Sequence, residues 1–138
     1  MKILILCTGN SGRSQMAEGY MHQFDPVSEV ISAGTSPRDR VNPYAVRVMA
    51  EEGIDISSHY PKDVTTYVND SFDYVITVCD NARESCPFFV GEVRHRLHFT
   101  FEDPTELGKS EEEALKTFRR VRDQIKVEFE KFHRSLSS

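Results

Sequence analysis

The chain has 138 residues, enough for one domain with a single buried core, and 38% hydrophobic with 28% charged residues is an ordinary globular composition. A net charge of −5 without a basic cluster argues against nucleic-acid binding, and no stretch resembles a signal peptide or could cross a membrane. Three cysteines do not form a disulfide framework, so we expect a cytoplasmic protein whose thiols are available for chemistry. Because no apolar feature demands a second subunit, we expect a monomer, with residues 1–138 as one domain.

The first strand and the first helix meet at a turn of small residues. Residues 3–6 form a continuous apolar run, which predicts a buried strand over residues 2–7. A helix is predicted over residues 12–24, and its apolar side chains share one face: Met16, Ala17, Tyr20, Met21 and Phe24. The turn from Cys7 to Ser14 therefore lies at the carboxyl end of a strand, where open α/β sheets bind ligands.

The middle of the chain continues this alternation. Residues 27–33 are predicted as a second strand, and a short helix is predicted within residues 63–69. Between them, Asn42 is expected to cap a helix that starts at Pro43 and ends near Gly53. The side chains expected to face inward from that helix are Ala45, Val46, Met49 and Ala50.

Two more strands and a long helix complete the predicted fold. Residues 72–78 are almost continuously apolar, as expected at a sheet centre, whereas residues 93–99 alternate like an edge strand. Ser110 and Glu113 form a capping box at the start of the last helix. The β-α-β-α order predicts an α/β fold, a doubly wound parallel sheet of about four strands with helices on both faces.

The turn after the first strand combines a nucleophile with an anion site. Amides of a glycine-rich turn at a helix N-terminus bind anions, and the same field should lower the pKa of Cys7 below its free value of about 8.5. Gly9 and Gly12 are expected to allow the backbone angles of this cradle, and Asn10 tolerates left-handed geometry. A buried structural cysteine is the simpler alternative, whereas a Walker A loop would need lysine in place of Arg13.

The pattern Cys7-x5-Arg13-Ser14 resembles the phosphate-binding loop of the low-molecular-weight protein tyrosine phosphatase superfamily, and the string CTGNSGRSQMAEG is similar to its arsenate reductase branch. The resemblance implies the same doubly wound sheet. It also implies an oxyanion bound by the guanidinium of Arg13, with Ser14 donating to the thiolate. The expected oxyanion-binding residues are Thr8, Gly9, Asn10, Ser11, Gly12, Arg13 and Ser14. Gly12 stands where the reductases carry a second cysteine and should make the loop more flexible.

Displacement of an oxygen from the bound oxyanion requires a proton donor near the thiolate. Asp103 is the candidate, because its loop leaves the same sheet edge as the Cys7 turn, and the family uses an Asp-Pro pair near this point. An ordinary turn at Asp103-Pro104 is the alternative.

Cys79 and Cys86 follow the central strand across a polar segment that we expect to be mobile. Their spacing does not fit zinc, and they are either structural thiols or redox partners of Cys7. The resemblance to thioredoxin-coupled arsenate reductases implies a relay. Cys7 forms a thiol-arsenate adduct, Cys79 attacks Cys7 and releases arsenite, and Cys86 attacks Cys79, leaving a redox-active disulfide that thioredoxin reduces.

The resemblance further implies a potassium site at Asn10, Glu18 and Ser32, although Lys62 disfavours a cation there, and we expect no other metal or cofactor. The main function predicted is arsenate reduction, with phosphate or sulfate as competing oxyanions.

A phosphatase with a Cys7 phosphocysteine is the alternative function. It is disfavoured because Thr105-Glu106 stands where such phosphatases often carry aromatic residues. A protein that binds oxyanions or responds to redox state without catalysis is the third reading.

Overall fold

The computed structural model describes residues 1–105 and 110–136. Strands and helices alternate along the chain as predicted. The elements are β1 (Lys2–Cys7), α1 (Arg13–Phe24), β2 (Glu29–Gly34), α2 (Pro43–Ala50), the 3-10 helix η1 (Val64–Tyr67), β3 (Phe72–Thr77), α3 (Asp80–Ser85), β4 (Val93–His98) and α4 (Glu111–Ser135).

The four strands form one parallel sheet in the order β2-β1-β3-β4, which confirms the predicted doubly wound architecture. β1 lies at the centre, and its residues Ile3 to Leu6 are fully buried, so both faces of the sheet are covered. β3 is the other inner strand, and β4 forms an edge, as the apolar and alternating patterns predicted. The strands all end at one edge of the sheet, where the loops after β1, β3 and β4 meet.

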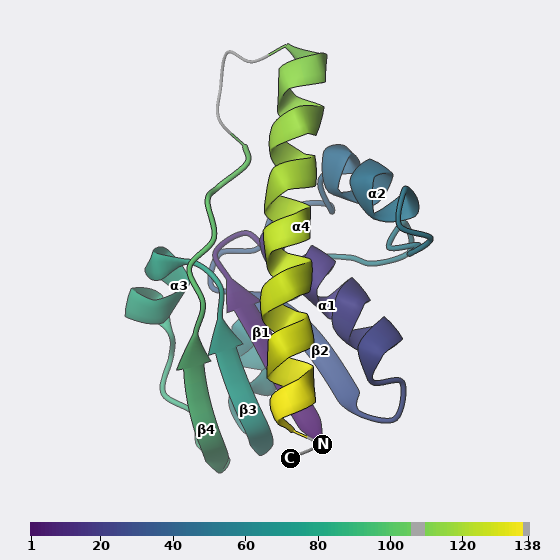
Figure 1. Cartoon of the computed structure of the whole chain (residues 1–138). Helices are drawn as coiled ribbons and strands as arrows, with labels where there is room; N and C mark the ends of the chain where they lie inside the picture. The colour runs from purple at the N-terminus through teal and green to yellow at the C-terminus, as the bar shows by residue number, and fades with distance from the viewer. Residues whose placement is uncertain (106–109, 137–138) are drawn as a thin grey trace.

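Helices α1 and α4 lie side by side across one face of the sheet (Figure 1). The connection from β2 to β3 contains α2, which packs against α4 and α1, and then η1. Aromatic side chains of α4 pack over the sheet: Phe129 lies edge-on to Phe99, and Phe132 lies edge-on to Tyr74. This packing places the first turn of α1 directly after the central strand.

The predicted helix caps are formed. The side chain of Asn42 accepts a hydrogen bond from the amide of Tyr44, and Ser110 accepts one from the amide of Glu113. Gly53 adopts a positive φ of 75° after α2, as its predicted role in ending the helix requires.

Two details of the prediction are wrong. Residues 80–85, predicted as a polar loop, form the helix α3, because the thiol of Cys79 accepts a hydrogen bond from the amide of Ala82 and starts the helix. In α2 the buried side chains are Ala45, Val48 and Met49, so Val48 takes the inward position predicted for Ala50.

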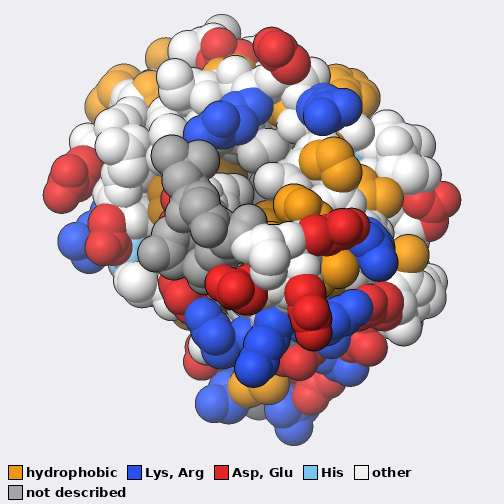
Figure 2. Space-filling view, turned by 90° about the horizontal axis from the view of Figure 1, so that it is seen from above, with side chains coloured by type: hydrophobic (Ala, Val, Ile, Leu, Met, Phe, Trp, Pro, Cys, Tyr) orange, Lys and Arg blue, Asp and Glu red, His pale blue; other side chains and the backbone are white. Residues whose placement is uncertain are grey.

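Acidic and basic side chains are interleaved over the end of the molecule seen in Figure 2. Ion pairs join α2 and the residue after it to α4, since Arg119 contacts Glu51 at 2.7 Å and Arg47 contacts Glu111 at 2.8 Å. No helix in residues 1–105 and 110–136 is long and apolar enough to span a bilayer.

Candidate active site

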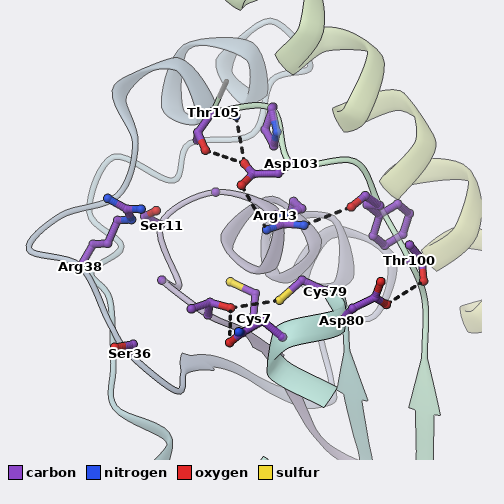
Figure 3. A pocket seen from close by; sticks show the side chains of 16 residues that line it. Cys7, Ser11, Arg13, Ser36, Arg38, Cys79, Asp80, Thr100, Asp103 and Thr105 are labelled. Carbon is purple, nitrogen blue, oxygen red and sulfur yellow. Dashed lines mark hydrogen bonds and ion pairs between the residues drawn. The ribbon is translucent and has the colours of Figure 1, made fainter. Parts of the chain in front are cut away.

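A pocket of about 690 Å³ opens at the carboxyl edge of the sheet, where the loops after all four strands meet (Figure 3). Its position confirms the general expectation for an open α/β sheet. The residues that line it are Cys7, Thr8, Gly9, Ser11, Gly12, Arg13, Ser36, Arg38, Cys79, Asp80, Asn81, Thr100, Phe101, Asp103, Pro104 and Thr105.

The Cys7 thiol lies at the base of this pocket and is surrounded by hydrogen-bond donors. Its Sγ is 2.9 Å from the Ser14 hydroxyl and accepts a hydrogen bond of 3.1 Å from the Asn10 amide. Burial nevertheless raises the pKa of Cys7, outweighing the opposite effect of these donors. The expectation of a lowered pKa was therefore wrong, because it counted the field of the loop and not the cost of removing the sulfur from water.

The loop is organised from behind by Asn10, which is fully buried and has a positive φ of 50°. The nitrogen of its side-chain amide donates to the hydroxyl of Ser14 at 2.7 Å and to that of Ser32 at 2.9 Å. Its amide oxygen accepts hydrogen bonds from the side chain of Gln15 and the backbone of Lys62. Because the Ser14 oxygen accepts from Asn10, its own hydrogen is free to point at the thiol, as the sequence suggested.

The glycines of the loop do not adopt the left-handed conformation. Neither Gly9 nor Gly12 has a positive φ, so a left-handed angle is not what requires glycine at either position. A Cβ at Gly34, the last residue of β2, would lie 2.5 Å from the carbonyl oxygen of Thr8. Residue 34 must therefore lack a side chain where the loop crosses β2. A Cβ at Gly12 would meet nothing within 4 Å, which leaves room for a side chain there.

Arg13 and Asp103 lie together on the pocket wall. The Arg13 guanidinium donates to the carbonyl of Phe101 at 3.1 Å and lies 3.9 Å from the Asp103 carboxylate. Burial opposes ionisation of Asp103, but hydrogen bonds from Thr105 and the charges of Arg13 and Arg38 outweigh burial and lower the pKa of this carboxyl. Of the Thr105-Glu106 pair in the prediction, Glu106 lies outside the described residues.

The second thiol shares the pocket with the first, and the third does not. Cys7 and Cys79 both line the pocket (Figure 3), and the Thr8 hydroxyl lies 3.3 Å from the Cys79 sulfur. Cys86 follows the last residue of α3, outside the pocket, and all three thiols are free. Burial raises the pKa of Cys86, while Arg96 acts to lower it.

Other predicted loop residues divide into two groups. Gly9, Ser11 and Gly12 line the pocket directly, whereas Asn10 and Ser14 are buried behind it and act on the thiol. Gly12 caps α1 without a side-chain hydrogen bond, so the first amides of the helix remain available to an anion.

Sequence reasoning missed the pocket residues Ser36 and Arg38. Both belong to the loop after β2, whose backbone pairs with the oxyanion loop: the amide of Arg38 donates to the carbonyl of Gly9 at 2.9 Å. The signal was present, because β2 pairs with β1 and its carboxyl end must reach the same edge.

The residues proposed to hold potassium lie together but do not fit that ion. The oxygen of the Asn10 side chain and that of Ser32 already accept hydrogen bonds. The ammonium of Lys62 lies 3.9 Å from Glu18 Oε1, so a cationic group is already beside the carboxylate. We therefore derive no step through potassium.

Comparison with known proteins agrees with this geometry. The model of the family described as low molecular weight phosphotyrosine protein phosphatase matches residues 2–138. The chain belongs to this family.

Among curated relatives in this phosphatase family, an arsenate reductase from Shouchella clausii is 41% identical over 131 residues, covering 94% of this chain and 93% of the relative. An arsenate reductase from Bacillus subtilis is 42% identical over 124 residues, covering 89% and 88%. A solved arsenate reductase in its phosphate binding state has a TM-score of 0.81 at 32% identity and covers 97% of both chains. A tyrosine phosphatase from Erwinia amylovora, at 20% identity and a TM-score of 0.82 over 99% and 93% of the chains, shows the shared fold alone.

Proposed function

We propose that the protein reduces arsenate to arsenite through Cys7, Cys79 and Cys86, with thioredoxin as the reductant. The observation that carries this proposal is the presence of a second thiol, Cys79, in the wall of the pocket whose base holds Cys7. A phosphatase needs one nucleophile, whereas reduction of a bound oxyanion needs a second sulfur within reach of the first. The relatives named arsenate reductase support the same choice.

The first step joins arsenate to Cys7. The thiolate attacks the arsenic atom while the loop amides and Arg13 bind the remaining oxygens. An As–S bond forms, an As–O bond breaks, and the departing oxygen leaves as water after taking a proton from Asp103. The donation from Ser14 stabilises the attacking thiolate against the cost of burial.

The second step transfers the electrons. Cys79 attacks the sulfur of Cys7, the S–S bond forms, and the As–S electron pair stays on arsenic, which leaves as arsenite. Two thiol sulfurs are oxidised and As(V) is reduced to As(III), so electrons balance. Cys86 then attacks Cys79, which frees Cys7 and leaves a disulfide between Cys79 and Cys86.

The last exchange requires α3 to open. Cys79 and Cys86 flank a helix of six residues, so their Cα atoms are about 10 Å apart along its axis. A disulfide needs Cα atoms within about 7 Å of one another. A short helix is marginal by itself, so this opening can occur without disturbing the sheet.

The decisive experiment couples NADPH oxidation to thioredoxin reductase, thioredoxin and arsenate. Wild type is compared with Cys79→Ser and Cys86→Ser, and each variant is also assayed for aryl phosphate hydrolysis. We expect arsenate-dependent turnover in the wild type alone. Sustained turnover in Cys86→Ser would contradict the relay.

Phosphatase activity is a second candidate, because the pocket has a thiol, an arginine and a carboxylic acid around one anion site. Hydrolysis of aryl phosphate that persists in both cysteine variants, without arsenate turnover, would establish it. Oxyanion binding without any product would instead indicate a binding protein.

The proposed chemistry also bears on the cellular compartment, the oligomeric state and the competing anions. Free thiols that cycle through a disulfide need a reducing compartment, so we place the reaction in the cytoplasm. A monomer suffices, since every residue named in the relay comes from one chain. Phosphate and sulfate share the tetrahedral shape of arsenate and should compete for the pocket.

A further inference from the structure

A second cluster of metal-ligating side chains lies behind the oxyanion loop, outside the pocket. It consists of Glu18 and His22 on α1 and His59 in the connection after α2. One imidazole nitrogen from each histidine and one carboxylate oxygen of Glu18 all lie within 4.8 Å of one another. The two imidazole rings are arranged edge to face, with centroids 6.0 Å apart. None of these side chains takes part in the proposed reduction.

The two oxygens of Glu18 have different surroundings. Oε1 accepts a hydrogen bond of 2.8 Å from the amide of Ser32 and has the Lys62 ammonium 3.9 Å away. Oε2 faces the histidines, 3.3 Å from His59 Nδ1 and 4.0 Å from His22 Nδ1. The cationic side chain and the imidazoles therefore approach opposite oxygens of one buried carboxylate.

His22 is oriented as a metal ligand. Its Nε2 lies 2.9 Å from the carbonyl oxygen of Val30, and a carbonyl only accepts, so the hydrogen of a neutral ring is on Nε2. The lone pair on Nδ1 then points toward Glu18 Oε2, which is also an acceptor. A backbone carbonyl that fixes the outer nitrogen of an imidazole is a common arrangement around metals.

His59 connects the cluster to the loop. Its Nδ1 lies 3.0 Å from the amide oxygen of Gln15, whose nitrogen donates to the backbone and side-chain oxygens of Asn10. Ligation of His59 would change this contact. The cluster is thus separated from the oxyanion loop by a single side chain.

We propose that Glu18, His22 and His59 form a binding site for a divalent transition-metal ion such as Zn²⁺. Two imidazoles and a carboxylate are a ligand set that zinc accepts, with bonds of about 2.0–2.2 Å and an open fourth position. Ligands in such a tetrahedron are about 3.4 Å apart, so the present spacing needs only a small contraction. Potassium needs several oxygen ligands. The histidine cluster instead offers imidazole nitrogens, which suit zinc, and they lie beside Glu18 Oε2, whereas Lys62 lies beside Glu18 Oε1.

The test must separate this site from the thiols, which also bind zinc. We would titrate Zn²⁺ into the full chain and into a Cys7→Ser, Cys79→Ser variant, and follow the imidazole nitrogens by NMR. The resonances of His22 and His59 should shift at one equivalent, while His95, His98 and His133 serve as internal controls. Imidazole resonances that stay unchanged for His22 and His59 in the double variant would overturn the proposal.

A ligand variant gives an independent measurement. His22→Gln should weaken Zn²⁺ binding by calorimetry about 100-fold in the double-variant background, because one of three ligands is lost. The matched control is His95→Gln, an exposed residue of β4 outside the cluster, which should leave the affinity unchanged. Equal affinity in His22→Gln and its parent would contradict the assignment, and a far-UV spectrum verifies that both variants are folded.

Discussion

Cys79 and Cys86 lie at opposite ends of α3, with one thiol capping the first turn and the other following the last helical residue. Formation of their disulfide should therefore destroy the helix. Amide hydrogen exchange across residues 82–86 should be at least about tenfold faster in the oxidised protein, because a six-residue helix has few hydrogen bonds to lose. Amides of α1 serve as the control. Equal protection of α3 in both redox states would show that the disulfide forms without unwinding.

Removal of the Ser14 hydroxyl should make Cys7 less reactive. Ser14→Ala deletes a donor 2.9 Å from the sulfur, so the pKa of the thiol should rise further and its alkylation should need higher pH. Each unit of added pKa costs about tenfold in thiolate at neutral pH. The measurement is the pH dependence of iodoacetamide labelling in a background without Cys79 and Cys86. Ser28→Ala, which removes a contact with Asp25 alone, is the control, and coincident profiles for Ser14→Ala and its parent would contradict the assignment.

Asp103→Asn should reduce turnover by about 10²- to 10⁴-fold, the usual effect of losing a general acid. The reaction needs Asp103 protonated and Cys7 deprotonated. Because the pKa of Asp103 is lowered and that of Cys7 is raised, activity should rise with pH through the pKa of Asp103 and fall through that of Cys7. Thr105 hydrogen bonds to the Asp103 carboxylate and helps to lower its pKa. Thr105→Val should therefore move the acid limb of kcat/KM to higher pH. If this limb of the pH profile does not move, it reports the titration of a group other than Asp103.

The ion pairs between α2 and α4 should appear in the acid stability of the protein. Arg119, followed by Arg122, lowers the pKa of Glu51 from 4.5 to about 2. A depressed carboxyl pKa stabilises the fold above pH 4.5, and this contribution is lost as pH falls toward 2. Glu51→Gln should cost about 1 kcal/mol in the free energy of unfolding at neutral pH, because the pair is partly screened by solvent.

Urea unfolding from neutral pH downward would measure this contribution. The difference between wild type and Glu51→Gln should shrink on acidification. Glu111→Gln breaks a more exposed pair with Arg47 and should change stability little. A constant difference at every pH would show that packing, and not charge, accounts for Glu51.

The sheet was predictable because its strands differ clearly in burial. Residues 72–78 are almost continuously apolar and take an inner position, and residues 93–98 alternate and take an edge. α3 was missed because its N-cap is Cys79, and cysteine is not among the residues that are preferred at helix N-caps.

In the site, Cys7, Arg13, Cys79 and Asp103 were predicted and the structure brings them together. Arg38 was missed although its loop follows β2 to the same sheet edge, because an arginine in a polar loop has no periodicity that indicates the direction of its side chain. The pKa of Cys7 was misjudged for a related reason, since the depth of burial depends on residues far apart in the chain.

The burial of Asn10 has a consequence for the affinity of the loop for a small oxyanion. The four hydrogen bonds of the Asn10 side chain hold the loop in shape before any anion arrives. A tetrahedral oxyanion has few atoms, so its contacts could not offset the conformational entropy lost if binding had to order eight loop residues. Preorganisation during folding removes that cost from the binding step. An inorganic ion can therefore be recognised here without the large contact area that an enzyme for a peptide substrate requires.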